Sequence, residues 1–440
     1  MITAITLNNF KSYEDARIPL GSLTVLIGGN ASGKSNAIEG LRLLSWFAQG
    51  HKLSSMHYAD SEKIVRGRLE DLGFLESDSF GFGCETDLPE WNQLTMKLQS
   101  RQGDLHLLSE SITAPGELIP LYQIYQNSEG VGSDVTVAYN NFSPSGYKPH
   151  VVCSDQFAIF TQLDSPAQFV CDNKKVQEVI PSTLKLYQEW LSNILFLDPA
   201  PASMREYSFI SDRRLRGDGK NLSSVLYSLW GDDIQSAEEP FKSQRQAILE
   251  FIQSLPEQAI ESLAFLFTPR NEVMVKLEET FGGTPRSYDA SLLSDGTLRV
   301  LAIAAAMLSA NEGSLVVIEE IDNGVHPSRA SHLLNQIQSI ARRRSLRVLL
   351  STHNPALLDA LPDSAIADVV FCYRDPQKGS SRMVRLHDIP DYPELMAQGS
   401  LGHLMTSGLM ERFVKFHPGS EERKAKALAW LTSIRSGGAQ

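Results

Sequence analysis

The first 47 residues contain three apolar segments followed by a helical pattern. Residues 2–9 alternate between the two faces of a strand, 16–20 form a second short apolar segment, and 23–27 are apolar and rich in β-branched residues. These segments predict a β-hairpin that leads into a buried strand. Apolar residues recur at helical spacing from 36 to 47, which predicts a helix directly afterwards.

Short apolar or alternating segments, separated by Gly, Asn, Asp and Pro, dominate residues 80–139. This pattern predicts an antiparallel β region inserted after the first helix. The expected strands are 80–87, 94–99, 105–111, 118–125 and 135–139. Helical spacing over 176–191 and the apolar segment 193–197 predict a helix and one more core strand, which ends at the chain-breaking turn 198–201.

The second half of the chain changes from a helical pattern to an α/β rhythm. Residues 202–288 have a mostly helical pattern, clearest at 221–230, 240–254 and 257–266. After residue 290 the expected order is a helix to 308, a strand at 315–318, a helix at 328–342 and a strand at 347–351. Strands that alternate with helices predict a largely parallel sheet, so the expected fold class is α/β.

Composition agrees with an ordinary soluble protein. The 440 residues are 42% hydrophobic and 21% charged, and this length favours more than one domain or lobe. The net charge of −12 argues against a broad nucleic-acid-binding surface, although it is compatible with a local basic patch. The four cysteines form no Cys-x-x-Cys pair, and the longest apolar segment, 300–308, is half a membrane span. We therefore expect a reducing, cytoplasmic location and no membrane partner.

The segment 28–35, Gly-Gly-Asn-Ala-Ser-Gly-Lys-Ser, is a phosphate loop between the expected strand and helix. Glycines let backbone N–H groups turn inward around phosphate oxygens, and the helix N-terminus adds positive potential there. Lys34 is expected to reach the β and γ phosphates, and Ser35 to ligate Mg²⁺. The predicted nucleotide-binding residues are Gly28, Asn30, Ala31, Ser32, Gly33, Lys34, Ser35 and Asn36.

Three further motifs follow the phosphate loop in chain order. Leu-Ser-Asp-Gly-Thr at 293–297 precedes an Ala-rich helix, the strand at 315–318 ends in Glu319 and Glu320, and Ser-Thr-His at 351–353 ends the next strand. A purely structural glutamate pair after a buried strand is unfavourable because burying charge is costly. His353 alone would more often be a histidine in a turn, and its position after the other motifs favours a function.

In this order the motifs resemble the ATP-binding-cassette type of ATPase, with Walker A, signature, Walker B, D-loop and switch histidine. The likeness covers residues 1–45 and 290–355, and the segments 9–13 and 318–327 narrow it to the RecF/SMC-like branch. Within that branch the chain is similar to short AAA-family ATPases related to the OLD family, without a coiled coil or zinc hook. Many of these act in bacterial anti-phage defence.

The resemblance implies an ABC-type P-loop ATPase core with a mostly parallel sheet, an antiparallel β-rich N-terminal lobe and a helical lobe. The expected division is 1–50 with 290–390 as the core, 51–197 as the β-rich insertion that completes lobe I, 198–289 as the helical lobe II, and 391–440 as a helical C-terminal tail. We expect this tail, whose charged segment is 421–431, to be a docking surface without chemistry, against either its own subunit or a partner.

The resemblance also implies a homodimer that sandwiches ATP and Mg²⁺, with a higher oligomer left open. Lys34 and Ser35 of one chain would face the signature of the other, and the implied signature contacts are Ser294, Asp295 and Gly296. Glu319 and Ser35 would hold Mg²⁺. Glu320 would polarise the attacking water, and His353 would contact the γ-phosphate or that water.

The sequence departs from the usual cassette pattern at several places. Glu319 replaces the usual Walker B aspartate, Asp295 replaces the second signature glycine, and His326 lies where a D-loop aspartate is common. The Q-loop position has no glutamine, and the turn 197–199 is the best positional candidate. Lys11, Asp322 and His326 are equally compatible with a site role and a scaffold role.

The preferred hypothesis is an ATP-driven switch that controls a separately encoded effector, such as a nuclease or toxin. A DNA repair or chromosome-maintenance ATPase is the main alternative, because basic clusters at 213–220 and 342–347 could contact nucleic acid, although solvated helix ends are the more ordinary explanation. An OLD-like nuclease lacks its paired-aspartate motif in the 87 residues after His353. A transporter ATPase is disfavoured by the β insertion and the missing glutamine.

Overall fold

The computed structural model describes residues 1–57, 64–101, 103–128, 132–143, 147–169, 173–231, 241–252, 260–281, 284–323, 326–389 and 391–416. The predicted helical tail at 421–431 and the start of the predicted helix at 257–266 lie outside these residues. Among the described residues no helix combines the length and apolarity needed to cross a membrane.

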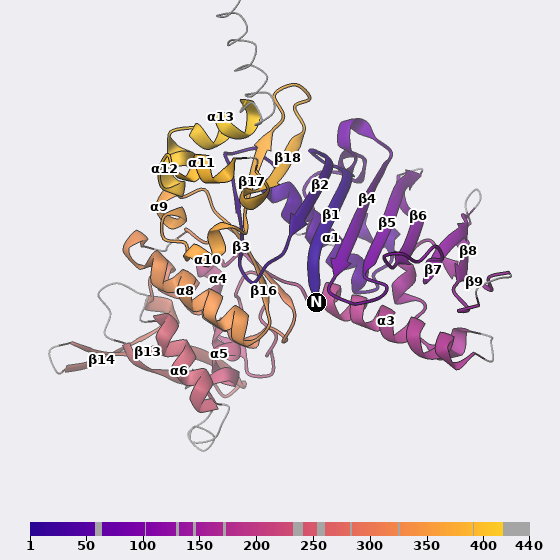
Figure 1. Cartoon of the computed structure of the whole chain (residues 1–440). Coiled ribbons are helices and arrows are strands. Elements are labelled where there is room, and N and C mark those ends of the chain that lie inside the picture. The colour runs from indigo at the N-terminus through magenta and orange to yellow at the C-terminus, as the bar shows by residue number, and fades with distance from the viewer. Residues whose placement is uncertain are drawn as a thin grey trace, which may run out of the picture.

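A single sheet of 14 strands runs across the described residues, parallel at one end and antiparallel at the other (Figure 1). The parallel strands are, in spatial order, β10 (Leu195–Leu197), β15 (Leu315–Ile318), β16 (Arg347–Ser351), β3 (Thr24–Ile27) and β17 (Val369–Arg374). β17 pairs antiparallel with β18 (Ser381–Arg385), which meets the hairpin of β2 (Tyr13–Pro19) and β1 (Ile2–Phe10).

The antiparallel end of the sheet forms the β-rich lobe. β1 pairs with β4 (Ser79–Thr86), and the order continues through β5 (Gln93–Arg101), β6 (Asp104–Thr113), β7 (Tyr122–Gln126), β8 (Asp134–Tyr139) and β9 (His150–Ser154). The antiparallel β region predicted after the first helix is therefore present. β7 begins four residues later than the predicted 118–125, with Leu118 98% exposed, and β9 was not predicted.

The parallel strands are short and apolar because both of their faces are covered. Along β3, Val25 and Ile27 join one hydrophobic core, whereas Leu26 between them joins the other. Helices α1 (Lys34–Ala48) and α3 (Lys174–Ser192) belong to the core that contains Leu26. Helices α7 (Asp295–Ser309) and α8 (Pro327–Arg343) belong to the opposite core. This arrangement confirms the α/β class, with parallel strands in the core and antiparallel strands in the β-rich lobe.

The lobe between β10 and α7 is mixed rather than helical. It contains α4 (Pro201–Met204), α5 (Leu222–Trp230), α6 (Phe241–Ile252) and an antiparallel sheet of β11 (Ser208–Phe209), β12 (Ile260–Phe267), β13 (Glu272–Phe281) and β14 (Thr284–Asp289). The helix predicted at 257–266 is wrong, because its described residues belong to strand β12. The apolar pattern of such a short segment is compatible with both a helix and a strand. Here the segment forms a strand because it pairs with β13 through the turn after Phe267.

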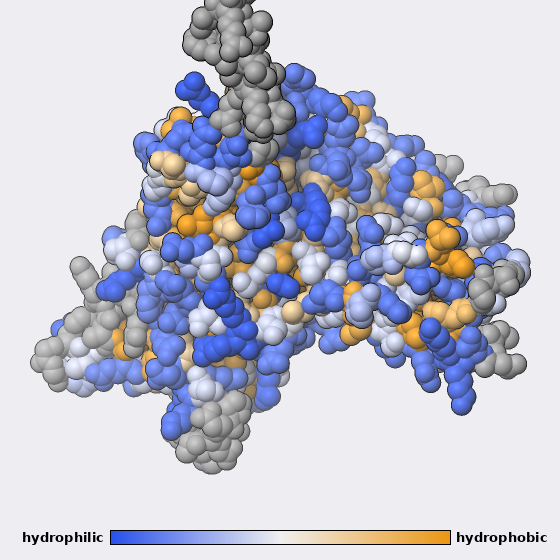
Figure 2. Space-filling model, viewed as in Figure 1, coloured by the Kyte–Doolittle hydropathy of each residue, from blue (hydrophilic) through white to orange (hydrophobic). Residues whose placement is uncertain are grey.

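The C-terminal helices pack on their own chain. They are α9 (Pro355–Leu358), α10 (Asp363–Ile366), α11 (Tyr392–Met396), α12 (Leu401–Thr406) and α13 (Leu409–Phe416). Leu404, Met410 and Phe413 are buried in the core shared with α7 and α8. On the face shown in Figure 2 the surface is mostly hydrophilic, with apolar residues in small separate groups.

One buried carboxyl organises the β-rich lobe. Glu110 on β6 accepts hydrogen bonds from the backbone N–H groups of Ile159 (2.9 Å) and Phe160 (2.8 Å) and from the Tyr122 hydroxyl. Burial raises the pKa of Glu110 to about 7, against the lowering effect of these three donors. Because the folded pKa is above the unfolded value, its protonation stabilises the fold below pH 4.5, and this contribution is lost as pH rises through 7.

In the parent protein the stabilisation by protonated Glu110 falls by roughly 3 kcal/mol between about pH 4.5 and 7. We predict that Glu110→Gln removes this part of the pH dependence of the free energy of unfolding. The measurement is urea unfolding of both proteins at several pH values. Glu85→Gln is the control, because Arg17 lowers the pKa of Glu85 and its contribution is lost only as pH falls. Equal slopes for the parent protein and Glu110→Gln would contradict this role of burial.

Candidate nucleotide-binding and hydrolysis site

Three of the four motifs singled out from the sequence meet at the carboxyl ends of three neighbouring strands. The phosphate loop follows β3, Glu319 and Glu320 follow β15, and His353 follows β16, which lies between those two strands. One cavity of about 440 Å³ opens there. It is lined by Ser12, Asn30, Ala31, Ser32, Gly33, Lys34, Ser35, Asn36, Arg66, Glu319, Glu320, Ser351, Thr352, His353 and Arg374. Ligands of open parallel sheets bind at this edge.

The phosphate loop is wrapped tightly between its neighbours. Gly28 has a φ of 145°, and a Cβ atom placed on it would lie 2.2 Å from the Cys372 carbonyl oxygen of β17. Gly33 has a φ of 111°, and its Cβ would lie 2.6 Å from the Ser381 Oγ and from the Tyr13 hydroxyl. Only glycine fits both positions, because each combines a left-handed backbone with direct contact.

The loop presents its polar groups as a phosphate site would require. The Lys34 ammonium donates to the carbonyl oxygens of Gly28 (2.6 Å) and Gly29 (3.1 Å). Burial lowers the pKa of Lys34 below its usual value, while Glu320 and Asp322 act in the opposite direction. The Ser32 hydroxyl is buried without a hydrogen-bond partner among the described residues. Together with the glycine cradle, this orphaned hydroxyl fits an anion held by the loop.

Glu319 is the more buried carboxyl of the pair after β15. Its backbone N–H donates to the Leu197 carbonyl oxygen (3.0 Å), and its carboxylate forms an ion pair with Arg42 of α1. Burial raises the pKa of Glu319, nearby Asp198 and Glu39 act in the same direction, and Arg42 opposes them. Ser35 lines the same cavity from the first turn of α1.

Glu320 is held in a sharp turn. Its φ is 45°, and its backbone N–H donates to the Ser351 hydroxyl of β16 at 3.0 Å. The Asn323 side-chain amide donates to the Glu320 carboxylate at 2.7 Å. A strained backbone that neighbouring strands hold in place often marks a functional site. The turn therefore fixes where the Glu320 carboxylate enters the cavity.

His353 is oriented by the residue that the sequence offered as part of the D-loop. The His353 Nδ1 lies 3.6 Å from the Asp322 carboxylate, whose other oxygen accepts a hydrogen bond from the Thr352 hydroxyl at 2.7 Å. The Asp322 side chain is buried, whereas His353 is 55% exposed toward the cavity mouth. His326 has a scaffold position, since its ring accepts a hydrogen bond from the Ser328 backbone N–H at the start of α8.

The signature residues do not line this cavity. Ser294 is the N-cap of α7, and its hydroxyl accepts a hydrogen bond from the Thr297 backbone N–H at 3.1 Å. Asp295 forms an ion pair with Arg205. Ser294 and Asp295 are exposed, and Gly296 is half-buried beside them. The structure therefore brings together the phosphate loop, the glutamate pair and His353, and leaves the signature as a separate exposed helix start.

The donor set suits magnesium better than a protein-only metal cage. Among the described residues, no group of three or more His, Cys, Asp and Glu side chains is arranged to hold a metal ion. Magnesium in nucleotide sites is bound by one or two protein oxygens together with phosphate oxygens and water. The Ser35 hydroxyl and the Glu319 carboxylate, both lining the cavity, are oxygen ligands of that kind.

Two arginines of the site belong to no recognisable motif. Arg66 and Arg374 line the cavity from a loop and from the end of β17. Glu39 of α1 is buried and forms ion pairs with Arg66 and with Lys11 of the segment 9–13. Arg66 and Arg374 come from distant parts of the chain, so their convergence leaves no local signal in the sequence.

The two basic clusters are largely occupied by their own chain. The Arg344 guanidinium donates to the carbonyl oxygens of Met307 (2.7 Å), Leu308 (2.6 Å) and Ala310 (2.7 Å) at the end of α7. Arg216 pairs with Asp212 at 2.8 Å. A structural role thus accounts for part of each cluster.

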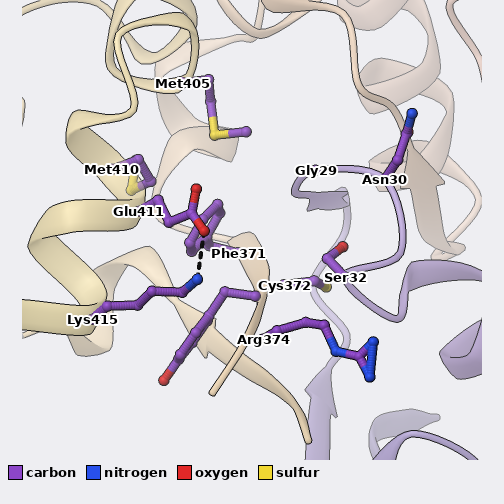
Figure 3. A pocket seen from close by; sticks show the side chains of 11 residues that line it. Gly29, Asn30, Ser32, Phe371, Cys372, Arg374, Met405, Met410, Glu411 and Lys415 are labelled. Carbon is purple, nitrogen blue, oxygen red and sulfur yellow. Dashed lines mark hydrogen bonds and ion pairs between the residues drawn. The ribbon is translucent and has the colours of Figure 1, made fainter. Parts of the chain in front are cut away.

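A second cavity, of about 340 Å³, lies beside the phosphate loop (Figure 3). Gly29, Asn30 and Ser32 face it from the loop, and the opposite wall comes from α12 and α13. That wall includes Met405 and Met410. The C-terminal helices therefore border the phosphate loop.

The parallel core, the phosphate loop after β3 and the paired glutamates after β15 define an ABC-type nucleotide-binding fold. A family model described as "AAA ATPase domain" matches residues 1–77, and one described as "AAA domain, putative AbiEii toxin, Type IV TA system" matches 166–359. The general activity that such AAA ATPase domains indicate is ATP hydrolysis. No curated protein sequence matches this chain.

Three of the similar solved structures are heads of SMC proteins. An SMC head bound to the C-winged helix domain of ScpA is 14% identical, with a TM-score of 0.46, covering 87% of this chain and 97% of that one. The SMC head domain from Thermotoga maritima is 13% identical, with a TM-score of 0.38, covering 87% and 98%. A Pyrococcus furiosus Smc head with an extended coiled coil, bound to the C-terminal domain of ScpA, is 12% identical, with a TM-score of 0.39, covering 93% and 99%.

We predict that Gly28→Ala weakens binding of a fluorescent ATP analogue at least about tenfold, because the added methyl group collides with the Cys372 carbonyl oxygen and strains the loop. Gly29→Ala is the matched control, since a Cβ at Gly29 meets nothing within 4 Å. Fluorescence titration of both variants is the measurement. Equal affinities would show that the close packing of Gly28 does not set the shape of the binding loop.

Proposed function

We propose that this protein is an ATP-binding and ATP-hydrolysing switch in which two subunits close on the nucleotide. The observation that carries this proposal is that the signature lies outside the cavity lined by Lys34, Glu319 and Glu320. Ser294 offers a hydroxyl at an exposed helix N-terminus, where an anion is favoured. A second copy that presents this helix start over the phosphate loop would complete the site on both subunits.

The geometry supports the following roles for the residues of the site. Lys34 would move from the loop carbonyl oxygens to the phosphates, and Gly28 and Gly33 keep the backbone N–H groups turned toward them. Ser35 and Glu319 would hold Mg²⁺, which neutralises phosphate charge when bound. Glu320, fixed by Ser351 and Asn323, is the general base for the attacking water. His353, supported by Asp322, would donate toward the γ-phosphate or the water.

An ATPase of this kind changes its shape, and the biological effect comes from a molecule that the closed dimer binds. We propose a separately encoded effector, a nuclease or toxin, in anti-phage defence, and the wording of the AbiEii family description supports this context. Direct DNA binding remains the alternative hypothesis. The two basic clusters give this hypothesis little support, because Arg344 and Arg216 already bind groups of their own chain.

We predict complementation between two inactive variants. Lys34→Ala removes the phosphate-binding ammonium, and Gly296→Asp places a carboxylate next to the γ-phosphate at a helix start that tolerates acidic residues. In a mixed dimer one of the two composite sites keeps both intact motifs, so mixing equal amounts should restore about a quarter of the parent phosphate release. No recovery would mean that the two motifs do not act across subunits.

A second prediction concerns the dimer itself. Glu320→Gln should abolish phosphate release while mass measurements in solution show a dimer that forms or tightens with ATP and Mg²⁺, because binding is retained without activation of water. Lys34→Ala is the control and should not respond to ATP. If the parent protein hydrolyses nothing and Glu320→Gln shows no change in mass, the cassette motifs serve only as scaffold.

A further inference from the structure

We infer that Arg42 is a built-in counter-cation for Glu319 that Mg²⁺ displaces, and that its movement couples metal–nucleotide binding to the connection into the mixed lobe. This inference rests on the proposed function and assigns a positioning role to a residue outside the cassette motifs. Four observations support it: the place of Arg42 on α1, its ion pair, the cavity beside it, and the hydrogen bonds that join that cavity to the mixed lobe.

The place on the helix follows from spacing. Arg42 is seven residues after Ser35 on α1, so the two side chains lie on the same face, two turns apart. The phosphate loop fixes the first turn of this helix. A cation on that face is therefore directed to the ends of β15 and β10, where Glu319 lies.

The ion pair occupies a carboxylate that the metal needs. Arg42 bonds to Glu319, with both side chains about a quarter exposed or less, and the guanidinium lies 5.5 Å from the centre of the Phe196 ring on β10. Partly buried pairs are screened less by solvent than surface pairs. A divalent cation held by Glu319 and Ser35 would repel the guanidinium, so the two cations compete for one carboxylate.

A second position for the guanidinium lies next to the first. A cavity of about 670 Å³ is lined by Arg42, Phe196, Asp198, Asp218 and other residues. Asp198 follows β10 as Glu319 follows β15, and these two strands pair in parallel with Leu197 opposite Ile318. Once it leaves Glu319, the guanidinium can turn about its own flexible side chain toward the carboxylates of Asp198 and Asp218, keeping its contact with Phe196.

This second position belongs to the entrance of the mixed lobe. The Asp198 backbone N–H donates to the Gly217 carbonyl oxygen, and the Ala200 N–H donates to the Asp218 carbonyl oxygen, each at 2.9 Å. The turn 197–199 is also where a Q-loop glutamine is missing. The movement of Arg42 on α1 would thus couple the state of the metal site to the mixed lobe, at the turn where the cassette pattern would place a glutamine.

The test measures the Mg²⁺ concentration that half-saturates binding of a fluorescent ATP analogue to full-length Glu320→Gln protein. Adding Arg42→Gln should lower this concentration roughly fivefold, because no internal cation has to leave Glu319. An unchanged or higher concentration would overturn the proposal, since a residue that only orients Glu319 would weaken metal binding when removed.

Two further variants sharpen the result. Arg216→Gln, which removes the other arginine of the same cavity, should leave the half-saturating concentration unchanged. Asp198→Asn should raise it roughly threefold, and this effect should disappear in the double variant with Arg42→Gln. An effect of Asp198→Asn that persists without Arg42 would overturn the second position of the guanidinium.

Failure of this inference and failure of the proposed function give different outcomes. If Glu320→Gln protein binds the analogue and the added Arg42→Gln has no effect on the Mg²⁺ dependence, only the counter-cation role of Arg42 is contradicted. If neither protein binds the analogue at any Mg²⁺ concentration, the proposed function falls and this inference with it.

Discussion

The close seating of the phosphate loop against β17 is the constraint on which the rest of the site depends. Gly28 touches the Cys372 carbonyl oxygen, and Gly33 touches Ser381 and Tyr13, so the loop takes its shape from three strands, two late in the chain and one early. That seating sets the first turn of α1 and therefore the direction of Ser35 and Arg42. A loop that was free to relax would lose the helix start and the metal ligand together.

Charge balance is the second organising principle. The edge of the parallel strands carries Glu319, Glu320 and Asp322, and α1 adds Glu39. Cations from several elements meet them: Arg42 binds Glu319, and Lys11 and Arg66 bind Glu39. Such a cluster is stable because each buried carboxylate has a partner, and it can respond to a metal because those partners sit on flexible side chains.

The sequence predicted four of the five parallel strands, because a phosphate loop, short apolar strands and helical spacing are local signals. The fifth, β17, was not predicted. The prediction failed where the signal is ambiguous or distant. Residues 260–266 carry apolar side chains at positions that suit a helix, and only pairing with β13 makes them a strand. Arg42, Arg66 and Arg374 reach the site through tertiary packing that no spacing along the chain reveals.

The sheet has a weak seam in an unexpected place. The strand pairing of β18 with β2 is short: Ser381 lies opposite Tyr13, and the Ser381 N–H donates to the Ser12 carbonyl oxygen at 2.7 Å. The same Ser381 and Tyr13 touch Gly33 of the phosphate loop. The pairing that joins the parallel and antiparallel strands into one sheet therefore also forms a wall of the phosphate loop. A substitution at Ser381 or Tyr13 would disturb the sheet and the loop together.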